Sequence, residues 1–214
     1  MHSFPKSLLD GYANFMSGKY QKIRGQYHEL ADKGQKPDTM IISCCDSRSA
    51  PETIFGTGPG ELFVVRNVAN LVPPFCPDDG GLHGTSAALE FAVQALKIKN
   101  IIVMGHGRCG GITASLTPDM EPLAPGNFIG KWMEMLEPVA QEANKNISLT
   151  KEERQTAVER ISIRNSVTNL RSFPYIAQKE SANKLTLYGA WFDIKTGELW
   201  VMDNKSGNFE RVKV

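Results

Sequence analysis

The chain has 214 residues, of which 41% are hydrophobic and 22% are charged, and its formal net charge is +1. This length suffices for one domain with a sizeable core. The near-zero charge argues against nucleic acid or an anionic membrane as a partner. Polar residues, proline and glycine interrupt the N-terminal segment, and no stretch approaches about 20 apolar residues. We therefore expect a cytoplasmic protein whose four cysteines are metal ligands, a catalytic thiol or core residues rather than disulfides.

Residues 1–33 are predicted to form two helices that end at Gly34, because their apolar residues recur at helical spacing. Both helices precede the first strand, so we expect an N-terminal arm that packs on a neighbouring chain rather than on its own core. Strand-like runs follow at 39–44, 61–67 and 100–106. These runs are short and continuously apolar, which is typical of buried parallel strands.

Helical patterns alternate with the strands in the rest of the chain. Helices are predicted at 84–96, 109–116, 127–140 and 151–181. The runs at 184–194 and 197–204 are expected to form a hairpin across Lys195–Thr196. The alternation predicts a single α/β domain over 1–214, with a mostly parallel central sheet flanked by helices and with C-terminal edge strands.

One candidate site lies at the end of the first predicted strand, in the run CCDSR (44–48). In an extended chain alternate side chains share a face. This spacing predicts that Cys44, Asp46 and Arg48 point together, and that Cys45 is a core residue on the opposite face. A thiol, a carboxylate and a guanidinium on one face form an unusual group for a strand end.

The run GHGRCGG (105–111) follows the third predicted strand. Its His-x-x-Cys spacing places an imidazole and a thiol close enough to bind one metal ion. Cys109 also begins a helix whose N-terminal dipole favours the thiolate form of the cysteine. Both candidate segments lie at the carboxyl ends of parallel strands, where open α/β sheets build their sites. Cys44, His106 and Cys109 therefore predict a Zn²⁺ site. Three protein ligands leave a fourth tetrahedral position for water, which is typical of a catalytic zinc.

Each of these residues also has an ordinary explanation when it is taken alone. A cysteine at a strand end is commonly a small buried side chain, and Asp-x-Arg is commonly a salt bridge. Residues 105–110 also match the dinucleotide fingerprint G-x-G-x-x-G, but 112–181 contains no strand-like run to complete a Rossmann unit. Cys76, in a proline-rich loop, is a spare candidate for a fourth ligand or a surface thiol. The convergence of three donors and a charged pair favours the metal site.

The paired motifs, Cys44-x-Asp46-Ser-Arg48 and His106-x-x-Cys109-Gly-Gly, resemble the signature of the β-class carbonic anhydrases. The resemblance extends over roughly residues 1–204 and is firmest over 35–116. It implies the family's α/β fold, with helices in 1–33 that clasp a partner to form a homodimer or homotetramer. It also implies reversible hydration of carbon dioxide to bicarbonate and a proton through a zinc-bound hydroxide.

The resemblance assigns roles to individual positions. It implies that Cys44, His106 and Cys109 bind zinc. Beside them Asp46 would accept a hydrogen bond from the zinc-bound water, and Arg48 would hold that carboxylate off the metal. The other positions that it places against substrate are Gln35, Phe63, Val68, Phe91 and Gly110. The three apolar members of this group are equally explained as core.

Two positions depart from part of the family. Members with a regulatory bicarbonate site carry tryptophan and valine where this chain has Ile41 and Ser49, so we predict no such site and an open zinc. His83 is a candidate proton shuttle. Two other functions stay open, namely the same scaffold acting on another small cumulene such as carbon disulfide, and a non-enzymatic, zinc-stabilised assembly protein. The latter would need a fourth cysteine or histidine ligand.

Overall fold

The computed structural model describes residues 4–77, 81–117 and 121–213. Within these ranges a six-stranded sheet has the order β2-β1-β3-β4-β5-β6. The first four strands in this order are parallel, and β5 and β6 continue the sheet antiparallel. The bounds are β1 Thr39–Cys44, β2 Leu62–Asn67, β3 Asn100–His106, β4 Thr186–Phe192, β5 Leu199–Met202 and β6 Phe209–Arg211.

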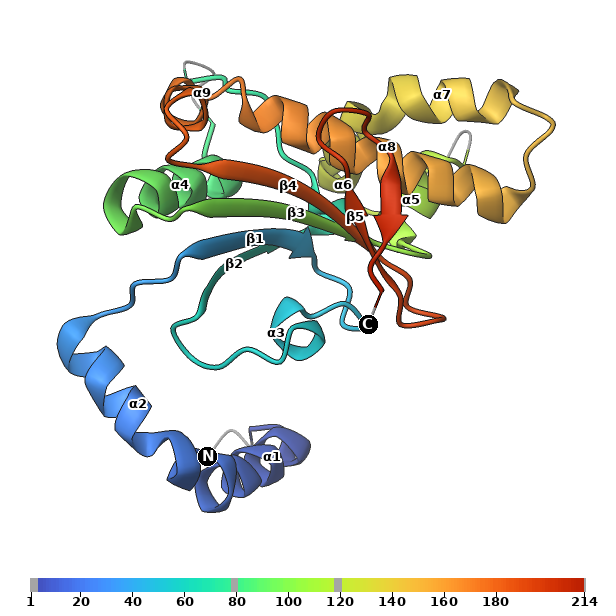
Figure 1. Ribbon diagram of the computed structural model, residues 1–214. Coiled ribbons are helices and arrows are strands. Elements are labelled where there is room, and N and C mark those ends of the chain that lie inside the picture. The colour runs from blue at the N-terminus through green and yellow to red at the C-terminus, as the bar shows by residue number, and fades with distance from the viewer. Residues whose placement is uncertain (1–3, 78–80, 118–120, 214) are drawn as a thin grey trace.

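Most helices cover one face of this sheet, with α8 lying across β3 and β4 (Figure 1). The short α3 lies near the opposite face, and α1 and α2 project away from the body of the molecule. The α-helices are α1 Lys6–Ser17, α2 Lys19–Lys33, α3 Pro51–Ile54, α4 Gly84–Glu90, α5 Gly110–Ser115, α6 Phe128–Met133, α7 Glu137–Lys145, α8 Lys151–Leu170 and α9 Pro174–Ser181. The other helical turns are η1 Val68–Asn70, η2 Phe91–Leu96 and η3 Glu134–Leu136. None of the helices in the described ranges is long and apolar enough to cross a membrane.

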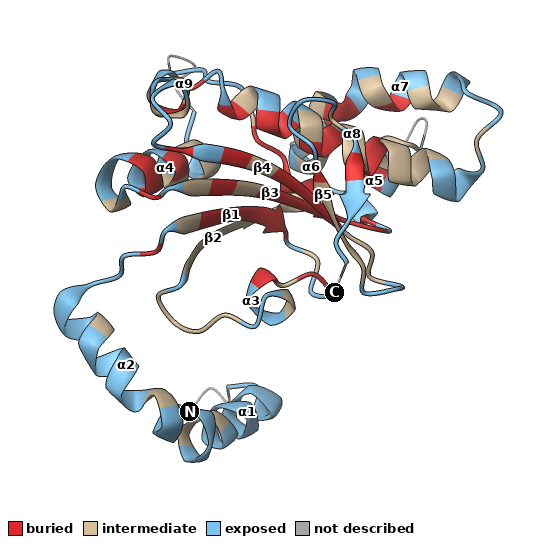
Figure 2. Ribbon diagram, in the orientation of Figure 1, coloured by how far each residue is buried: buried red, intermediate tan, exposed pale blue. Residues whose placement is uncertain are grey.

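The core divides around the sheet. The main cluster joins the strands to α4, α8 and α9, and Figure 2 shows the central strands and the facing side of α8 as buried. A second cluster surrounds Cys44 and Cys109 and includes residues of α5, α6 and α7. Because this second cluster packs over the carboxyl ends of β1 and β3, it encloses the edge where the two candidate segments meet.

The sequence prediction of the α/β fold with a mostly parallel sheet is confirmed, with some differences in the helices. The predicted helix 151–181 is divided into α8 and α9, because Pro174 cannot continue a helix from the residues before it. The predicted helix 127–140 is interrupted by η3, and 84–96 changes from α4 to a π-helical turn. The short elements α3 and β6 were not predicted, since three or four residues carry little periodicity.

The C-terminal hairpin has a longer turn than the predicted Lys195–Thr196 connection. The backbone N–H of Asp193 donates to Glu198 O at 2.9 Å, and that of Gly197 donates to Asp193 O at 2.8 Å. Gly197 has a φ of 75°, which a residue with a side chain adopts less readily. A glycine is therefore well suited to this position of the turn.

Close packing between α8 and the sheet yields a test of stability at Gly189 of β4. A Cβ at Gly189 would lie 2.9 Å from Ile163 Cγ2 and 3.1 Å from Met202 Cβ. Gly189→Ala is therefore expected to lower the free energy of unfolding by about 1–3 kcal/mol. Gly25→Ala, in α2, is the control, because a Cβ there meets no described atom within 4 Å. Urea unfolding at one fixed protein concentration measures both variants, and equal stability of the two would contradict the packing argument.

Candidate metal centre

The two candidate segments meet at one edge of the sheet. Strands β1 and β3 are adjacent and parallel, with Ser43 opposite Met104, so their carboxyl ends lie together. Cys44 ends β1, His106 ends β3, and Cys109 is the residue before α5. Their potential ligand atoms all lie within 4.8 Å of one another. Parallel pairing therefore brings together two cysteines that are 65 residues apart in sequence.

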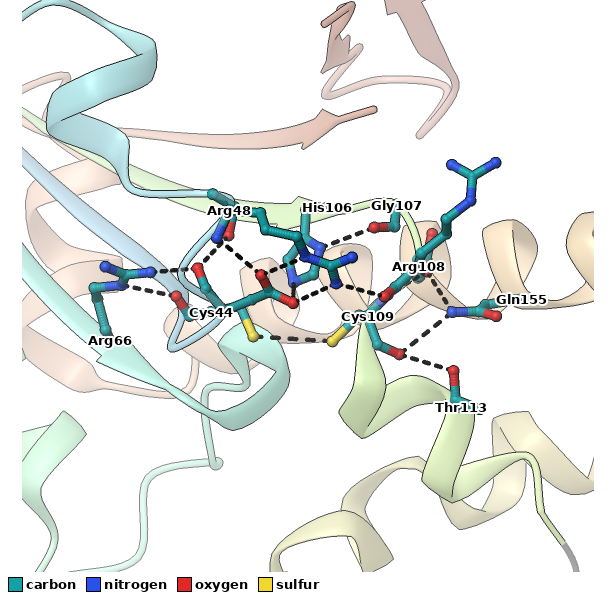
Figure 3. Close-up of polar contacts among 12 residues, drawn as sticks. Cys44, Arg48, Arg66, His106, Gly107, Arg108, Cys109, Thr113 and Gln155 are labelled. Atoms are coloured by element: carbon teal, nitrogen blue, oxygen red, sulfur yellow. Dashed lines mark hydrogen bonds and ion pairs between the residues drawn. The ribbon is translucent and has the colours of Figure 1, made fainter. Parts of the chain in front are cut away.

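The imidazole of His106 is oriented for a metal. Its Nδ1 lies 2.9 Å from Gly107 O and donates to it, which leaves Nε2 as an acceptor (Figure 3). The side chain is buried, and Nε2 has no hydrogen-bond partner among the described residues. A buried lone pair beside two sulfurs is a costly arrangement unless a cation or a donor occupies the space. The Cys₂His donor set fits zinc.

The two sulfurs lie within hydrogen-bonding distance of each other. Cys44 Sγ and Cys109 Sγ are 3.9 Å apart and share a hydrogen bond. This bond lowers the pKa of Cys44 to about 4 and raises the pKa of Cys109, because one proton is held between the two sulfurs. Backbone N–H groups also support both sulfurs, those of Asp46 and Ala69 for Cys44 and those of the first α5 turn for Cys109. The centre is therefore prepared to hold negative charge, as a zinc–thiolate site requires.

Asp46 and Arg48 form a tightly bound pair beside the sulfurs. Arg48 donates to Asp46 Oδ1 from its backbone N and from Nε, both at 2.9 Å, and to Oδ2 from Nη2 at 2.6 Å. This fork holds the pKa of Asp46 below its usual range. Asp46 Oδ2 is also 3.9 Å from His106 Nε2. The pair is therefore adjacent to the place where the ligand atoms converge.

The local geometry of this pair differs from the prediction. The strand ends at Cys44, and the backbone N–H of Ser49 donates to Asp46 O at 3.1 Å, so residues 46–49 form a turn. The expected alternation of side chains along an extended strand is therefore wrong, although the turn brings Asp46 and Arg48 together. The prediction that Cys45 is a core residue is also wrong, since Cys45 is exposed.

Two further arginines support the segments that carry the ligands. Arg66 of β2 donates from Nε to Cys44 O at 2.8 Å and from Nη2 to Asp46 O at 2.6 Å (Figure 3). Arg108 has a φ of 58°, and its carbonyl accepts a bond of 3.3 Å from Arg48 Nη2. Sequence analysis missed both roles. The signal for Arg66 was a charged residue inside an otherwise apolar strand.

The remaining residues predicted against substrate divide into two groups. Val68 and Gly110 lie at the metal centre, because Val68 packs on the cluster around Cys44 and Gly110 follows Cys109. Phe63 and Phe91 pack together with ring centroids 5.9 Å apart, but Phe63 lies opposite Met40, four residues before Cys44. Four residues of strand span about 13 Å.

Gln35 is farther still, since it lies between α2 and the start of β1. Together with Phe63 and Phe91 it belongs to the amino-terminal edge of the sheet, whereas Cys44 ends β1 at the opposite edge (Figure 1). Within one chain, then, the fold does not bring these three residues to the ligands.

Neither Cys76 nor His83 lies within the group of ligand atoms found in the described part of the chain. Cys76 is exposed. His83 precedes α4 and lines a cavity of about 300 Å³ with Arg66, Asn67 and Trp132. The described ligand set therefore contains Cys44, His106 and Cys109 without a fourth cysteine or histidine.

Comparison with known proteins points to one family. A family model described as "Carbonic anhydrase" matches residues 39–199. Carbonic anhydrase of Helicobacter pylori (strain ATCC 700392 / 26695) is 34% identical over 205 residues, which cover 94% of this chain and 92% of the relative. Beta carbonic anhydrase 3 of Arabidopsis thaliana is 34% identical over 203 residues, covering 93% of this chain and 78% of the relative.

Solved structures agree with these sequence matches. The β-carbonic anhydrase CcaA has a TM-score of 0.89 and 29% identity, and the alignment covers 98% of this chain and 100% of CcaA. A tetrameric β-carbonic anhydrase of Sordaria macrospora has a TM-score of 0.77 and 27% identity, and the alignment covers 98% of this chain and 96% of the S. macrospora chain. The family match, the two relatives and the shared fold lead to one conclusion: this chain belongs to the β-class carbonic anhydrases, a family of lyases.

Proposed function

We propose that this protein catalyses the reversible hydration of carbon dioxide to bicarbonate and a proton, at a zinc ion held by Cys44, His106 and Cys109. The observation that carries the proposal is the position of Asp46, whose Oδ2 lies 3.9 Å from the unpaired His106 Nε2. A purely structural zinc does not require a fixed carboxylate beside its ligands, because protein ligands fill all four of its positions.

When bound, zinc supplies a Lewis acid that lowers the pKa of a coordinated water. The chain's own residues orient the reactants. Asp46 accepts a hydrogen bond from a water beside Oδ2, and Arg48 keeps that carboxylate from turning toward the sulfurs. Val68 presents an apolar wall to carbon dioxide, and the backbone N–H of Gly110 donates to a bicarbonate oxygen. The lowered pKa of Asp46 makes this carboxylate a poor proton acceptor. The water would therefore lose its proton to a buffer base in solution, and its oxygen would then bond to the carbon of carbon dioxide.

We also propose that the zinc centre is open at neutral pH. Ile41 lies in the core at 1% exposure, and Ser49 is buried at 1% and bonds Asp46 O at 3.2 Å. Ser49 thereby stabilises the turn in which Arg48 holds Asp46. These contacts favour the paired state of Asp46 and leave the fourth zinc position to water.

A second copy of the chain is proposed to complete the site. Helices α1 and α2 have no buried residue in the described structure. Several of their large apolar side chains are therefore exposed to solvent. These are Leu8, Leu9, Tyr12 and Tyr27. Exposed apolar faces of this kind mark association surfaces. In a homodimer, or in a homotetramer built from it, the Gln35, Phe63 and Phe91 group of one copy would face the metal centre of another.

A reducing compartment such as the cytoplasm suits this centre. All four cysteines are free, and the sulfurs of Cys44 and Cys109 lie only 3.9 Å apart. Oxidation of this pair would remove two of the three ligands.

Stopped-flow measurement of carbon dioxide hydration, at about pH 7 and about pH 8.5, tests the proposed function on protein of known zinc content. We expect about one zinc per chain and rapid turnover at both values of pH. Turnover only at the higher pH would contradict the open state. Bound zinc without turnover at either pH would contradict the proposed reaction, and would favour another small cumulene or a structural metal.

Complementation between two inactive variants tests the shared site. Cys44→Ala removes a ligand, and Gln35→Ala combined with Phe91→Ala removes the residues proposed to serve the partner. Mixing the two after partial unfolding is expected to form heterodimers in which one site is intact, with roughly a quarter of the wild-type activity at equal mixing. Activity that stays at the level of the separate variants would show that each chain uses its own Gln35 and Phe91.

A further inference from the structure

A buried carboxylate lies beneath the second ligand segment. Glu159 of α8 is 2% exposed and accepts hydrogen bonds from three donors. The backbone N–H of Cys109 bonds Oε1 at 3.0 Å, Gln155 Nε2 bonds Oε1 at 3.1 Å, and Trp191 Nε1 bonds Oε2 at 3.0 Å. Since all three neighbours donate, both side-chain oxygens of Glu159 act as acceptors. Burial raises the pKa of this carboxyl group.

Helix α8 holds the backbone on both sides of Cys109. The N–H of Cys109 bonds Glu159, while its carbonyl accepts a bond of 3.3 Å from Gln155 Nε2. Thr113 adds a bond of 3.1 Å from Oγ1 to the same carbonyl, as Figure 3 shows. Because these bonds fix the peptide groups that flank its Cα, they determine the direction in which the Cys109 side chain leaves the backbone.

Trp191, the third donor to Glu159, supports the part of the ligand segment that precedes Cys109. A Cβ at Gly107 would lie 3.1 Å from Trp191 Cζ2, so the indole packs directly against this glycine. The next residue, Arg108, has a φ of 58°, a conformation that is strained for a residue with a side chain. A strained link between His106 and Cys109 needs neighbours that hold it, and Trp191 and Glu159 are in contact with both sides of it.

We propose that Glu159 is a positioning residue for the metal, which holds the Cys109 thiolate in place through the backbone. Gln155 and Trp191 hold the carboxylate in turn. The inference rests on the proposed zinc site. Partners behind metal ligands contribute about 10- to 100-fold to metal affinity in other proteins.

The substitution Glu159→Gln tests the proposal, because it keeps the shape of the side chain and replaces one acceptor by a donating amide. In either orientation that amide faces an N–H group, of Trp191 or of Cys109. We expect zinc affinity, measured by competition with a chromophoric chelator, to fall about 10- to 100-fold. The visible absorption bands of the Co²⁺-substituted protein should shift, because the sulfur of Cys109 changes its angle to the metal.

Ser166→Ala is the matched control. Ser166 is also buried on α8, and its Oγ accepts a bond of 3.2 Å from the backbone N–H of Val72, which belongs to no ligand segment. This control is expected to lose stability while its zinc affinity and Co²⁺ spectrum stay those of wild type. A merely structural role for Glu159 would lower stability in both variants and alter metal binding in neither.

Wild-type zinc affinity and Co²⁺ bands in folded Glu159→Gln would overturn the proposal. If Glu159→Gln does not fold, Trp191→Phe and Gln155→Met each remove one donor to the carboxylate, and unchanged affinity in both would overturn it equally. Zinc affinity and Co²⁺ spectra can be measured without turnover. A wild-type protein that binds zinc without hydrating carbon dioxide would therefore contradict only the proposed reaction. A wild-type protein that binds no zinc would contradict both the proposed reaction and the proposed role of Glu159.

Discussion

Replacing Arg48 by alanine is expected to lower kcat/KM for carbon dioxide hydration by about 100-fold or more, while zinc content stays near one per chain. Arg48 makes three hydrogen bonds to Asp46, two from its guanidinium fork and one from its backbone N–H, and the alanine variant keeps only the backbone bond. The freed carboxylate, already 3.9 Å from His106 Nε2, can then turn toward the metal and take the fourth position. Stopped-flow hydration together with zinc analysis measures both parts of this expectation.

Arg48→Lys is the companion variant, because lysine keeps the charge and loses the planar fork. We expect its kcat/KM for carbon dioxide hydration to lie between those of Arg48→Ala and the wild type. An alanine variant with normal turnover would contradict the role assigned to Arg48, and one without zinc would show that the arginine acts on metal retention instead.

The pH response of the pair follows from the lowered pKa of Asp46. Because the pKa is below its unfolded value, the pair contributes stability at pH values above the usual aspartate range, and this contribution is lost as the pH falls through the folded pKa. Asp46 therefore stays ionised between about pH 5 and 8 in the wild type. In Arg48→Ala its pKa is expected to rise toward the ordinary value, and acid unfolding should begin at a higher pH.

Replacing Cys44 by alanine is expected to remove zinc and to reduce hydration to the rate without enzyme. Two ligands, His106 and Cys109, hold the ion far less tightly than three, and the remaining thiol loses the partner with which it shares a hydrogen bond. The zinc content per chain after dialysis and the rate of carbon dioxide hydration, measured on the same sample, test this prediction.

Cys45→Ala is the control for this prediction, since Cys45 is the adjacent residue in sequence and its side chain is exposed. It should keep both zinc and activity. Equal loss of zinc in the two variants would mean that the substitutions act by disturbing the end of β1. Retention of zinc in Cys44→Ala would remove Cys44 from the ligand set.

The amino-acid sequence by itself determined the class of fold and the identity of the candidate ligands. Three short apolar runs with helices between them indicate buried parallel strands, because such strands are covered on both faces. Parallel strands place their carboxyl ends on one edge, and this rule was enough to bring Cys44 to His106 and Cys109. The structure confirms that they lie together.

Only the tertiary structure decided how the neighbouring side chains are held. Asp46 and Arg48 meet through a turn, and whether a chain turns or stays extended after Cys44 depends on contacts such as those of Arg66 from another strand. Glu159 lies 50 residues beyond Cys109 and reaches it because α8 crosses β3. No periodicity in the sequence records such a contact.

The tertiary structure also separated Gln35, Phe63 and Phe91 from the ligands. A strand carries its residues in one direction at about 3.3 Å each, so residues near its start cannot reach the site at its end. The sequence named chemical groups suited to the reaction, but the direction of β1 and β2 determines which of them one chain can use. Gln35, Phe63 and Phe91 can act at a metal centre only if, as we propose, a second copy of the chain brings them to it.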